Sequence, residues 1–235
     1  MIVIQNLIKS FGSIYALRGI NLTLNAGEFW MIVGPNGAGK TTLLKIIATL
    51  SRATDGSITI DGADPHRSRL NVRKQIGFIG HQSFLYDKLT AEENLRFYSR
   101  MYLVKQNDRE IDDLLAQVGL IERKTDLVRN FSRGMHQRLA IARALLNDPR
   151  IILLDEPFTG LDQRGIDIFT HLLQSLVSPD RLLMMTTHDL HVGWSLADHY
   201  AIISRGKVLD QQACRETTFE NFQANYRNMT EGSIS

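Results

Sequence analysis

A glycine-rich segment near the start of the chain has the residue types and spacing of a phosphate-binding loop. It runs Gly34-Pro-Asn-Gly-Ala-Gly39-Lys40-Thr41 and follows Phe29–Val33, an apolar run typical of a buried parallel strand. Its glycines allow the backbone to fold around phosphate oxygens and to turn N–H groups toward them. The residues expected to contact a nucleotide here are Gly34, Pro35, Asn36, Gly37, Ala38, Gly39, Lys40, Thr41 and Thr42.

The end of this segment supplies a cation and a hydroxyl. Lys40 can place its ammonium group against the β- and γ-phosphates, and Thr41 can offer its hydroxyl to Mg²⁺. A helix that begins near Lys40 directs the positive end of its dipole at the same charge. The bland alternative, a glycine turn without a ligand, does not account for a strand before the loop and an apolar helix after it. ATP and Mg²⁺ are therefore the expected cofactors.

A pair of acidic residues follows a second apolar strand. Ile151-Ile-Leu-Leu-Asp155 ends in a carboxylate, and Glu156 comes next. A carboxylate at a strand end can hold Mg²⁺ or its water ligands. The neighbouring carboxylate can act as a general base toward a water molecule. A charge pair that merely ends a strand is common, but the glycine-rich loop upstream favours the metal-ligand and base assignments.

The elements that must position these residues alternate between strand and helix. Residues 2–27 read as paired strands with a turn at 25–27, and further short strands are expected at 58–60, 76–79, 182–187 and 200–203. Between about 89 and 146 the pattern becomes helical. It opens with Thr90 and Glu93, which have the spacing of a capping box. This alternation indicates an α/β fold with an inserted helical part.

The chain length fits one large α/β domain or a core plus a subdomain, and we expect residues 1–235 to form a single domain. Residues 1–87 and 148–212 are expected to form the nucleotide-binding α/β core with its β subdomain. Residues 88–147 should form the helical subdomain, and 213–235 a short helix with a frayed tail.

The composition limits the partners and the cellular compartment that can be expected for the protein. Its 27 Lys and Arg residues against 25 Asp and Glu residues provide no broad basic surface, so no nucleic-acid partner is expected. Cys214 is the only cysteine, which excludes an intrachain disulfide and fits a reducing compartment. No signal peptide and no apolar run of membrane-spanning length are recognisable. A membrane connection is therefore expected to go through another polypeptide.

The order of further motifs resembles the nucleotide-binding domain of ABC transporters over nearly the whole chain. Phe11, in Lys9-Ser-Phe-Gly, occupies the place of the aromatic residue that stacks on adenine. Gln82 matches the glutamine that senses Mg²⁺ and γ-phosphate, and His188 matches the histidine that contacts the γ-phosphate. The resemblance implies a P-loop ATPase core with an N-terminal antiparallel β subdomain and an inserted helical subdomain. It also implies the catalytic residues Glu156, His188 and Gln82, and the Mg²⁺ ligands Thr41, Gln82 and Asp155.

The same resemblance predicts the partners. Ser132-Arg-Gly134-Met135 lies at the family's signature motif, although Arg and Met replace the usual Gly and Gln. In that family, the matching Ser and Gly face the γ-phosphate of an opposite subunit, and the loop matched by Gly160-Leu-Asp162 crosses the interface. The expected partners are thus a second ATPase subunit, paired head to tail, and a transmembrane permease subunit. The expected location is the cytoplasmic face of the cell membrane, as a peripheral protein.

Rival assignments fit fewer residues. A GTPase would need an Asn-Lys-x-Asp motif that the sequence lacks. A soluble ABC protein that acts on nucleic acid usually duplicates the cassette, whereas this chain has one P-loop. The cluster of His188, His191 and His199 lacks the spacing typical of a metal site.

Two observations bear on the kind of transporter. Ile79-Gly-His-Gln82 and Leu89-Thr-Ala-Glu-Glu-Asn-Leu resemble the ATPase of the cytochrome c maturation (haem exporter) system, which we take as the leading interpretation. The segments 131–135 and 155–162 are also shared with drug and polysaccharide exporters of the ABC-2 type, which form the alternative. Phe84, Leu85 and Tyr86 are predicted either to dock the permease or to pack inside the domain.

Overall fold

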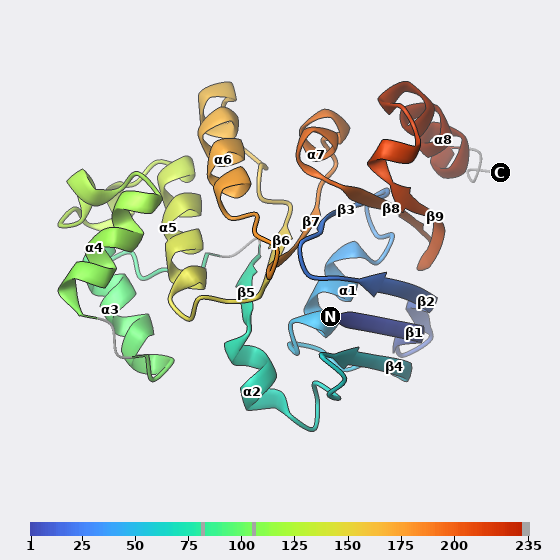
Figure 1. Cartoon of the computed structure of the whole chain (residues 1–235), viewed down its shortest axis with the longest axis horizontal. Coiled ribbons are helices and arrows are strands. Elements are labelled where there is room, and N and C mark those ends of the chain that lie inside the picture. Colours follow the sequence, from blue (N-terminus) through green and yellow to red (C-terminus); the bar gives the residue numbers. More distant parts are fainter. Residues whose placement is uncertain (81–82, 105–106, 232–235) are drawn as a thin grey trace.

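Two β-sheets organise the chain in the computed structural model, which describes residues 1–80, 83–104 and 107–231 (Figure 1). The smaller sheet is antiparallel and has the strand order β2-β1-β4. Its strands are β1 (Ile2–Phe11), β2 (Ile14–Leu24) and β4 (Asp55–Ile60). The expected pairing of the first two strands is confirmed. Their hairpin closes at Gly12-Ser13, and the turn expected at 25–27 leads from β2 into the next strand.

The larger sheet carries the chemistry-bearing loops. Its order is β5-β6-β7-β3-β8-β9, parallel throughout except for the last strand. The strands are β3 (Phe29–Val33), β5 (Ile76–Ile79), β6 (Ile151–Asp155), β7 (Leu182–Thr186), β8 (His199–Ser204) and β9 (Lys207–Ala213). Every residue of β3, β6 and β7 is buried, which explains why these segments read as unbroken apolar runs.

Helices cover both faces of this sheet. They are α1 (Lys40–Ile47), α2 (Arg69–Lys74), α3 (Ala91–Met101), α4 (Asp108–Gln117), α5 (Arg133–Leu145), α6 (Gln163–Ser175), α7 (Leu190–Leu196) and α8 (Phe219–Glu231). Short 3-10 turns occupy Ile121–Arg123, Val128–Asn130 and Cys214–Glu216. Figure 1 draws α3, α4 and α5 together on one side of the strands, as expected for an inserted helical part. The α/β fold class is thereby confirmed.

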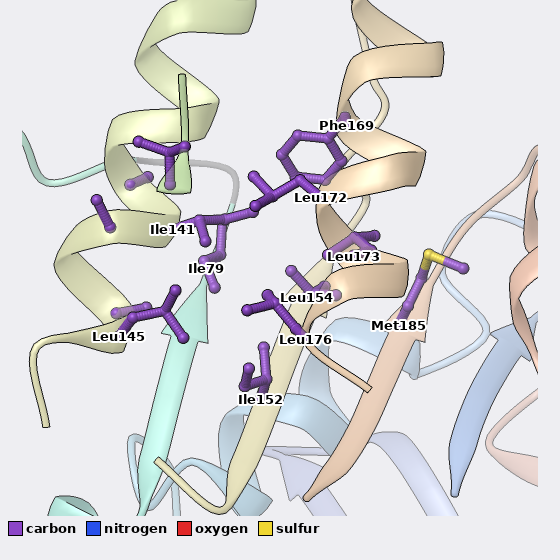
Figure 2. Close-up of a cluster of buried hydrophobic side chains, with 14 of the residues drawn as sticks. Ile79, Ile141, Leu145, Ile152, Leu154, Phe169, Leu172, Leu173, Leu176 and Met185 are labelled. Carbon is purple, nitrogen blue, oxygen red and sulfur yellow. The ribbon is translucent and has the colours of Figure 1, made fainter. Parts of the chain in front are cut away.

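Strand alternation divides the core into two layers. On β6, Ile152 and Leu154 point into one cluster, while Ile151 and Leu153 point into the other. Figure 2 shows the first cluster, in which side chains of α5 and α6 converge on β5, β6 and β7. The second cluster joins α1 to the antiparallel sheet. The two layers hold the carboxyl ends of the central strands at one fixed edge.

Two local predictions have clear outcomes. The capping box at the start of α3 is confirmed, since the Thr90 hydroxyl accepts a hydrogen bond from the Glu93 N–H and the Glu93 carboxylate accepts one from the Thr90 N–H. The short helix expected after residue 213 is present as α8, which runs for 13 residues and buries Phe222 completely. Residues 232–235, where a frayed tail was predicted, lie outside the described part. Among the described helices, none has both the length and the apolar character needed to cross a bilayer.

Candidate nucleotide-binding and catalytic site

The glycine-rich loop between β3 and α1 has a backbone that requires glycine at specific places. Gly34 has a φ of 154°, and a Cβ there would lie 1.9 Å from the Ile203 carbonyl oxygen. Gly39 has a φ of 107°, and a Cβ there would lie 2.5 Å from the Ala16 carbonyl oxygen. Around Gly37, in contrast, nothing lies within 4 Å of a Cβ position. The loop is therefore packed at both ends and open at its middle, where a phosphate group can approach the backbone.

Lys40 begins α1 and lies inside this loop. Its side chain is buried, and its Nζ donates to the carbonyl oxygens of Gly34 at 2.6 Å and Pro35 at 3.2 Å. Burial lowers the pKa of the Lys40 ammonium, and the nearby charges of Asp155 and Glu156 oppose that shift. The loop thus holds a cation at the place where phosphate oxygens would enter. Within the same segment, Asn36 is exposed, Ala38 is buried, and Thr42 is half-buried in the first turn of α1.

Asp155 ends β6 and is bound by hydroxyl groups from two directions. Thr41 Oγ1 donates to its Oδ1 at 2.9 Å, and Thr186 Oγ1 donates to the same oxygen at 2.8 Å. A carboxylate and a hydroxyl are the hard oxygen donors that Mg²⁺ takes, so Thr41 and Asp155 fit that ion. No group of three or more His, Cys, Asp or Glu side chains forms a cage among the described residues. An ion at this place would have to share its coordination with phosphate oxygens and water.

Glu156 follows Asp155 directly at the end of the same strand. Its Oε2 lies 2.7 Å from Nδ1 of His188, which follows β7. The Glu156 side chain is 25% exposed and that of His188 is 67% exposed, so solvent reaches both groups. A carboxylate with this access can take a proton from a water molecule. The structure therefore brings together Lys40, Thr41, Asp155, Glu156 and His188 at one edge of the sheet.

Phe11 ends β1, apart from the buried core. It is 57% exposed, and Lys9 Nζ lies 4.8 Å from the centre of its ring. Its partner in the strand register is Ile14, also exposed. An exposed ring on a hairpin can stack on a flat base.

Ser132 and Gly134 lie in a different part of the molecule. Ser132 caps α5, accepting a hydrogen bond from the Met135 N–H at 3.3 Å, and it is exposed. Figure 1 draws α5 apart from α1, with β5 and β6 between them. The Arg133 guanidinium lies against Gly160, since a Cβ at Gly160 would be 2.3 Å from its Nη1. The fold thus places the Ser132 segment beside the 160–162 loop, not in the phosphate-binding loop of the same chain.

Two residues need separate mention. Gln82, which the sequence predicts to be a catalytic residue and an Mg²⁺ ligand, lies outside the described residues. Thr186, which binds Asp155, was not predicted from the sequence. The signal that could have found it is a threonine at the end of an apolar strand, immediately before the segment that carries His188.

Comparison with known proteins places this arrangement in a family. Residues 17–159 match the protein family described as ABC transporter. The lantibiotic transport ATP-binding protein SrtF of Streptococcus pyogenes is 38% identical over 209 residues, which cover 89% of each chain. The bacitracin transport ATP-binding protein BcrA of Bacillus licheniformis is 34% identical over 231 residues, which cover 98% of this chain and 74% of the relative.

A solved structure agrees with both the sequence and the fold. The dimeric post-hydrolysis state of the ATP-binding cassette MJ0796, bound to ADP and Pi, is 31% identical to this chain with a TM-score of 0.81. The similarity covers 91% of this chain and 98% of that one.

Proposed function

This chain belongs to the ABC transporter family as an ATP-hydrolysing subunit, and we propose that it drives the export of an antibiotic peptide or drug through a separate membrane permease. The observation that carries the proposal is the pair of relatives named for lantibiotic and bacitracin transport. One of them aligns with 98% of this chain. We place the protein at the cytoplasmic face of the membrane, as a peripheral subunit, with no nucleic-acid partner.

Haem handling in cytochrome c maturation is the second candidate. It was favoured by two sequence segments, and the first of them includes residues 81–82, which lie outside the described part. The second, residues 89–95, has a purely structural account. Thr90 and Glu93 form the capping box of α3, and the Asn94 side-chain amide binds the Tyr86 backbone, its oxygen accepting from the N–H and its nitrogen donating to the carbonyl oxygen. That pattern therefore supports a helix start and carries little information about cargo, and neither relative described above is named for haem.

The roles that we assign to the site residues follow from their geometry. Lys40 and the loop N–H groups would bind the phosphates, because they combine a buried cation with an open backbone concavity. Glu156 would accept the proton of the attacking water, and His188 would orient that carboxylate through their 2.7 Å contact. Thr41 and Asp155 would hold Mg²⁺, with Gln82 assigned by resemblance alone. Bound Mg²⁺ would offset the charge of the phosphates.

Two partners complete the proposal. A second copy of the chain would supply Ser132 and Gly134 to the phosphates in a head-to-tail dimer. A permease would dock on the exposed surface formed by Phe84, Tyr86 and Phe97, which are 53%, 47% and 40% exposed. Leu85, between the first two, packs against the core instead. Leu85 therefore fits the packing alternative for this segment, and we assign docking to the exposed residues Phe84 and Tyr86.

Purification from native membranes tests the proposal. The full chain with Glu156→Gln is tagged, and we expect it to bind MgATP while its hydrolysis falls by ~10²–10⁴-fold relative to wild type. A polytopic membrane protein should copurify with it. The wild-type complex is then reconstituted, and ATP hydrolysis is measured with bacitracin, an anthracycline and haem. Stimulation by haem alone would contradict antibiotic export and favour the second candidate. Absence of ATP hydrolysis in the wild-type complex would contradict both.

A further inference from the structure

Thr186 places a completely buried hydroxyl group between the two acidic residues of the site. It ends β7 beside Asp155, its partner in the parallel register, and it is 0% exposed. The four residues before it, Leu182 to Met185, are all apolar and buried. A hydroxyl in such surroundings is unfavourable unless it is fully hydrogen-bonded. The role of Thr186 can therefore be inferred from the hydrogen bonds of its hydroxyl group.

The polarity of these bonds is fixed by their partners. The Glu156 N–H can only donate, and it lies 3.0 Å from Thr186 Oγ1. The single hydroxyl proton is then free to be donated to Asp155 Oδ1, at 2.8 Å. Thr186 thus accepts from the backbone of one acidic residue and donates to the side chain of the other. We propose that Thr186 is a positioning residue for ATP hydrolysis, whose hydroxyl fixes Asp155 and Glu156 relative to each other.

The backbone of Glu156 explains why such a residue is needed. Its φ is 52°, in the left-handed region that residues with a side chain rarely adopt. The surrounding structure has to hold this conformation, and the Glu156 N–H is bound by both the carbonyl oxygen of Thr186, at 3.1 Å, and its hydroxyl. The conformation turns the Glu156 carboxylate toward His188. Removing the hydroxyl leaves one acceptor for that N–H and relaxes the constraint.

The same hydroxyl extends a chain of contacts to the phosphate-binding loop. Thr41, in the first turn of α1, donates to the same Oδ1 atom of Asp155. The order Thr41, Asp155, Thr186, Glu156 therefore joins α1 to the candidate general base through three hydrogen bonds. Misalignment at Thr186 would act on the chemical step more than on ATP binding, which depends mainly on Lys40 and the loop backbone. This inference rests on the roles proposed above for Asp155 and Glu156.

Three variants of the full chain test the inference. Thr186→Val keeps the shape of the side chain and removes the hydroxyl, and Thr186→Ser restores the hydroxyl. The matched control is Thr49→Val, because Thr49 is 1% exposed and its Oγ1 also accepts one hydrogen bond, from Arg73 Nε at 2.8 Å, outside the site. Steady-state hydrolysis, binding of a fluorescent ATP analogue, melting temperature and amide exchange of Glu156 are measured for each variant.

We expect Thr186→Val to lower kcat by about 10- to 100-fold, the range for losing a hydrogen bond to a charged group, while nucleotide affinity changes by less than about threefold. The Glu156 amide should exchange faster, and Thr186→Ser should recover most of the rate. Thr49→Val should alter melting temperature without a comparable loss of kcat.

Other results would overturn the inference. A wild-type kcat in Thr186→Val would do so, and so would an equal loss of kcat in Thr49→Val, which would indicate a general effect of stability. Comparison with Glu156→Gln distinguishes an error in the role of Thr186 from an error in the choice of the catalytic base. If Glu156→Gln is inactive while Thr186→Val is fully active, only the role of Thr186 is wrong. If Glu156→Gln hydrolyses ATP at the wild-type rate, the proposed catalytic base is wrong as well.

Discussion

Lys40 is a charged residue that is buried inside the glycine-rich loop. Its ammonium is bound by two backbone carbonyl oxygens, and the carboxylates of Asp155 and Glu156 help to keep it charged while burial opposes that charge. Phosphate oxygens can replace the carbonyl contacts without moving the cation into water. The arrangement therefore favours binding of an anion over an empty loop.

Phe11 is the residue whose contribution to ATP binding is simplest to isolate. It is exposed and makes no core contact, so its removal should leave the fold intact. We expect Phe11→Ala to weaken ATP binding by about 1 kcal/mol, the value typical of an aromatic stacking pair. A titration with a fluorescent ATP analogue measures the effect. Phe11→Tyr should bind normally because it keeps the ring, and unchanged affinity in Phe11→Ala would remove the residue from the site.

The sequence indicated candidate residues one at a time, without the contacts between them. Lys40 could be singled out because it ends a recognisable glycine-rich loop, and Asp155 and Glu156 because they end an apolar strand. The contact between Glu156 and His188 and the bridging position of Thr186 depend on the pairing of β6 with β7. These strands are separated by all of α6, and local sequence pattern does not specify which strands become neighbours.

At the scale of elements, α3 and the segment before it form a rigid platform with apolar side chains on its outside. Buried Asn94 accepts from the Tyr86 N–H at 2.8 Å and donates to the Tyr86 carbonyl oxygen at 3.0 Å. The Tyr86 ring meets Phe97 edge-on at a centroid distance of 4.8 Å. The backbone is thus held in place while both rings remain partly exposed, which suits a surface that receives a partner helix.

A charge on this platform should impair membrane association. We expect Tyr86→Glu to lower the fraction of the chain that copurifies with membranes by at least about tenfold, because a buried unpaired carboxylate opposes docking. ATP binding by the purified chain should persist, since Tyr86 does not contact the phosphate-binding loop. The matched control is Leu209→Glu, an apolar residue that is 41% exposed and belongs to β9, a strand that lies far from α3 in Figure 1. Normal membrane recovery of Tyr86→Glu would contradict docking on this surface.

The C-terminal helix shows which part of a polar segment the sequence could predict. Residues after 213 are mostly polar, so a short helix with a frayed tail was expected. The helix is present as α8, but the sequence did not indicate its aromatic contacts: Phe222 stacks on Trp194 at 5.0 Å and packs against Tyr200 at 4.7 Å. These partners come from α7 and β8, and the aromatic cluster holds α8 against both. A few aromatic residues within a polar helix were sufficient because their partners are already fixed by the sheet.

At the scale of the whole molecule, the proposed catalytic unit contains two copies of the chain. Its own phosphate-binding loop holds Lys40, while Ser132 lies exposed at the start of α5, beside the 160–162 loop. An exposed hydroxyl at a helix N-terminus is a suitable anion site, but Ser132 does not lie in the phosphate-binding loop of its own chain. The cassette of known structure described above is dimeric and is 31% identical to this chain. A head-to-tail dimer would bring Ser132 of one copy to the phosphates bound by the other.

Mixed dimers test this arrangement directly. Lys40→Ala removes the cation of the phosphate-binding loop. Ser132→Asp keeps an oxygen that can cap α5 but, in the proposed dimer, would place a negative charge against the phosphate bound by the partner. If each site combines Lys40 of one chain with Ser132 of the other, one Lys40→Ala chain paired with one Ser132→Asp chain retains one intact site. A chain with both changes, paired with wild type, retains none, because each of the two sites then has one defect.

We therefore expect the first mixed dimer to hydrolyse ATP at about half the wild-type rate if its sites act independently, and the second at a rate at least about tenfold lower. Crosslinked dimers assembled with the membrane subunit are the material for this measurement, since isolated subunits can pair weakly. Ser132→Asn, which keeps the cap without the charge, is the control for an effect on α5 alone. If the two mixed dimers have equal activity, Ser132 is not needed at either site, whereas higher activity of the second dimer would mean that Ser132 serves the site of its own chain. Ser132 would then have no part in hydrolysis by its partner, even though ATP hydrolysis by the subunit itself would stand.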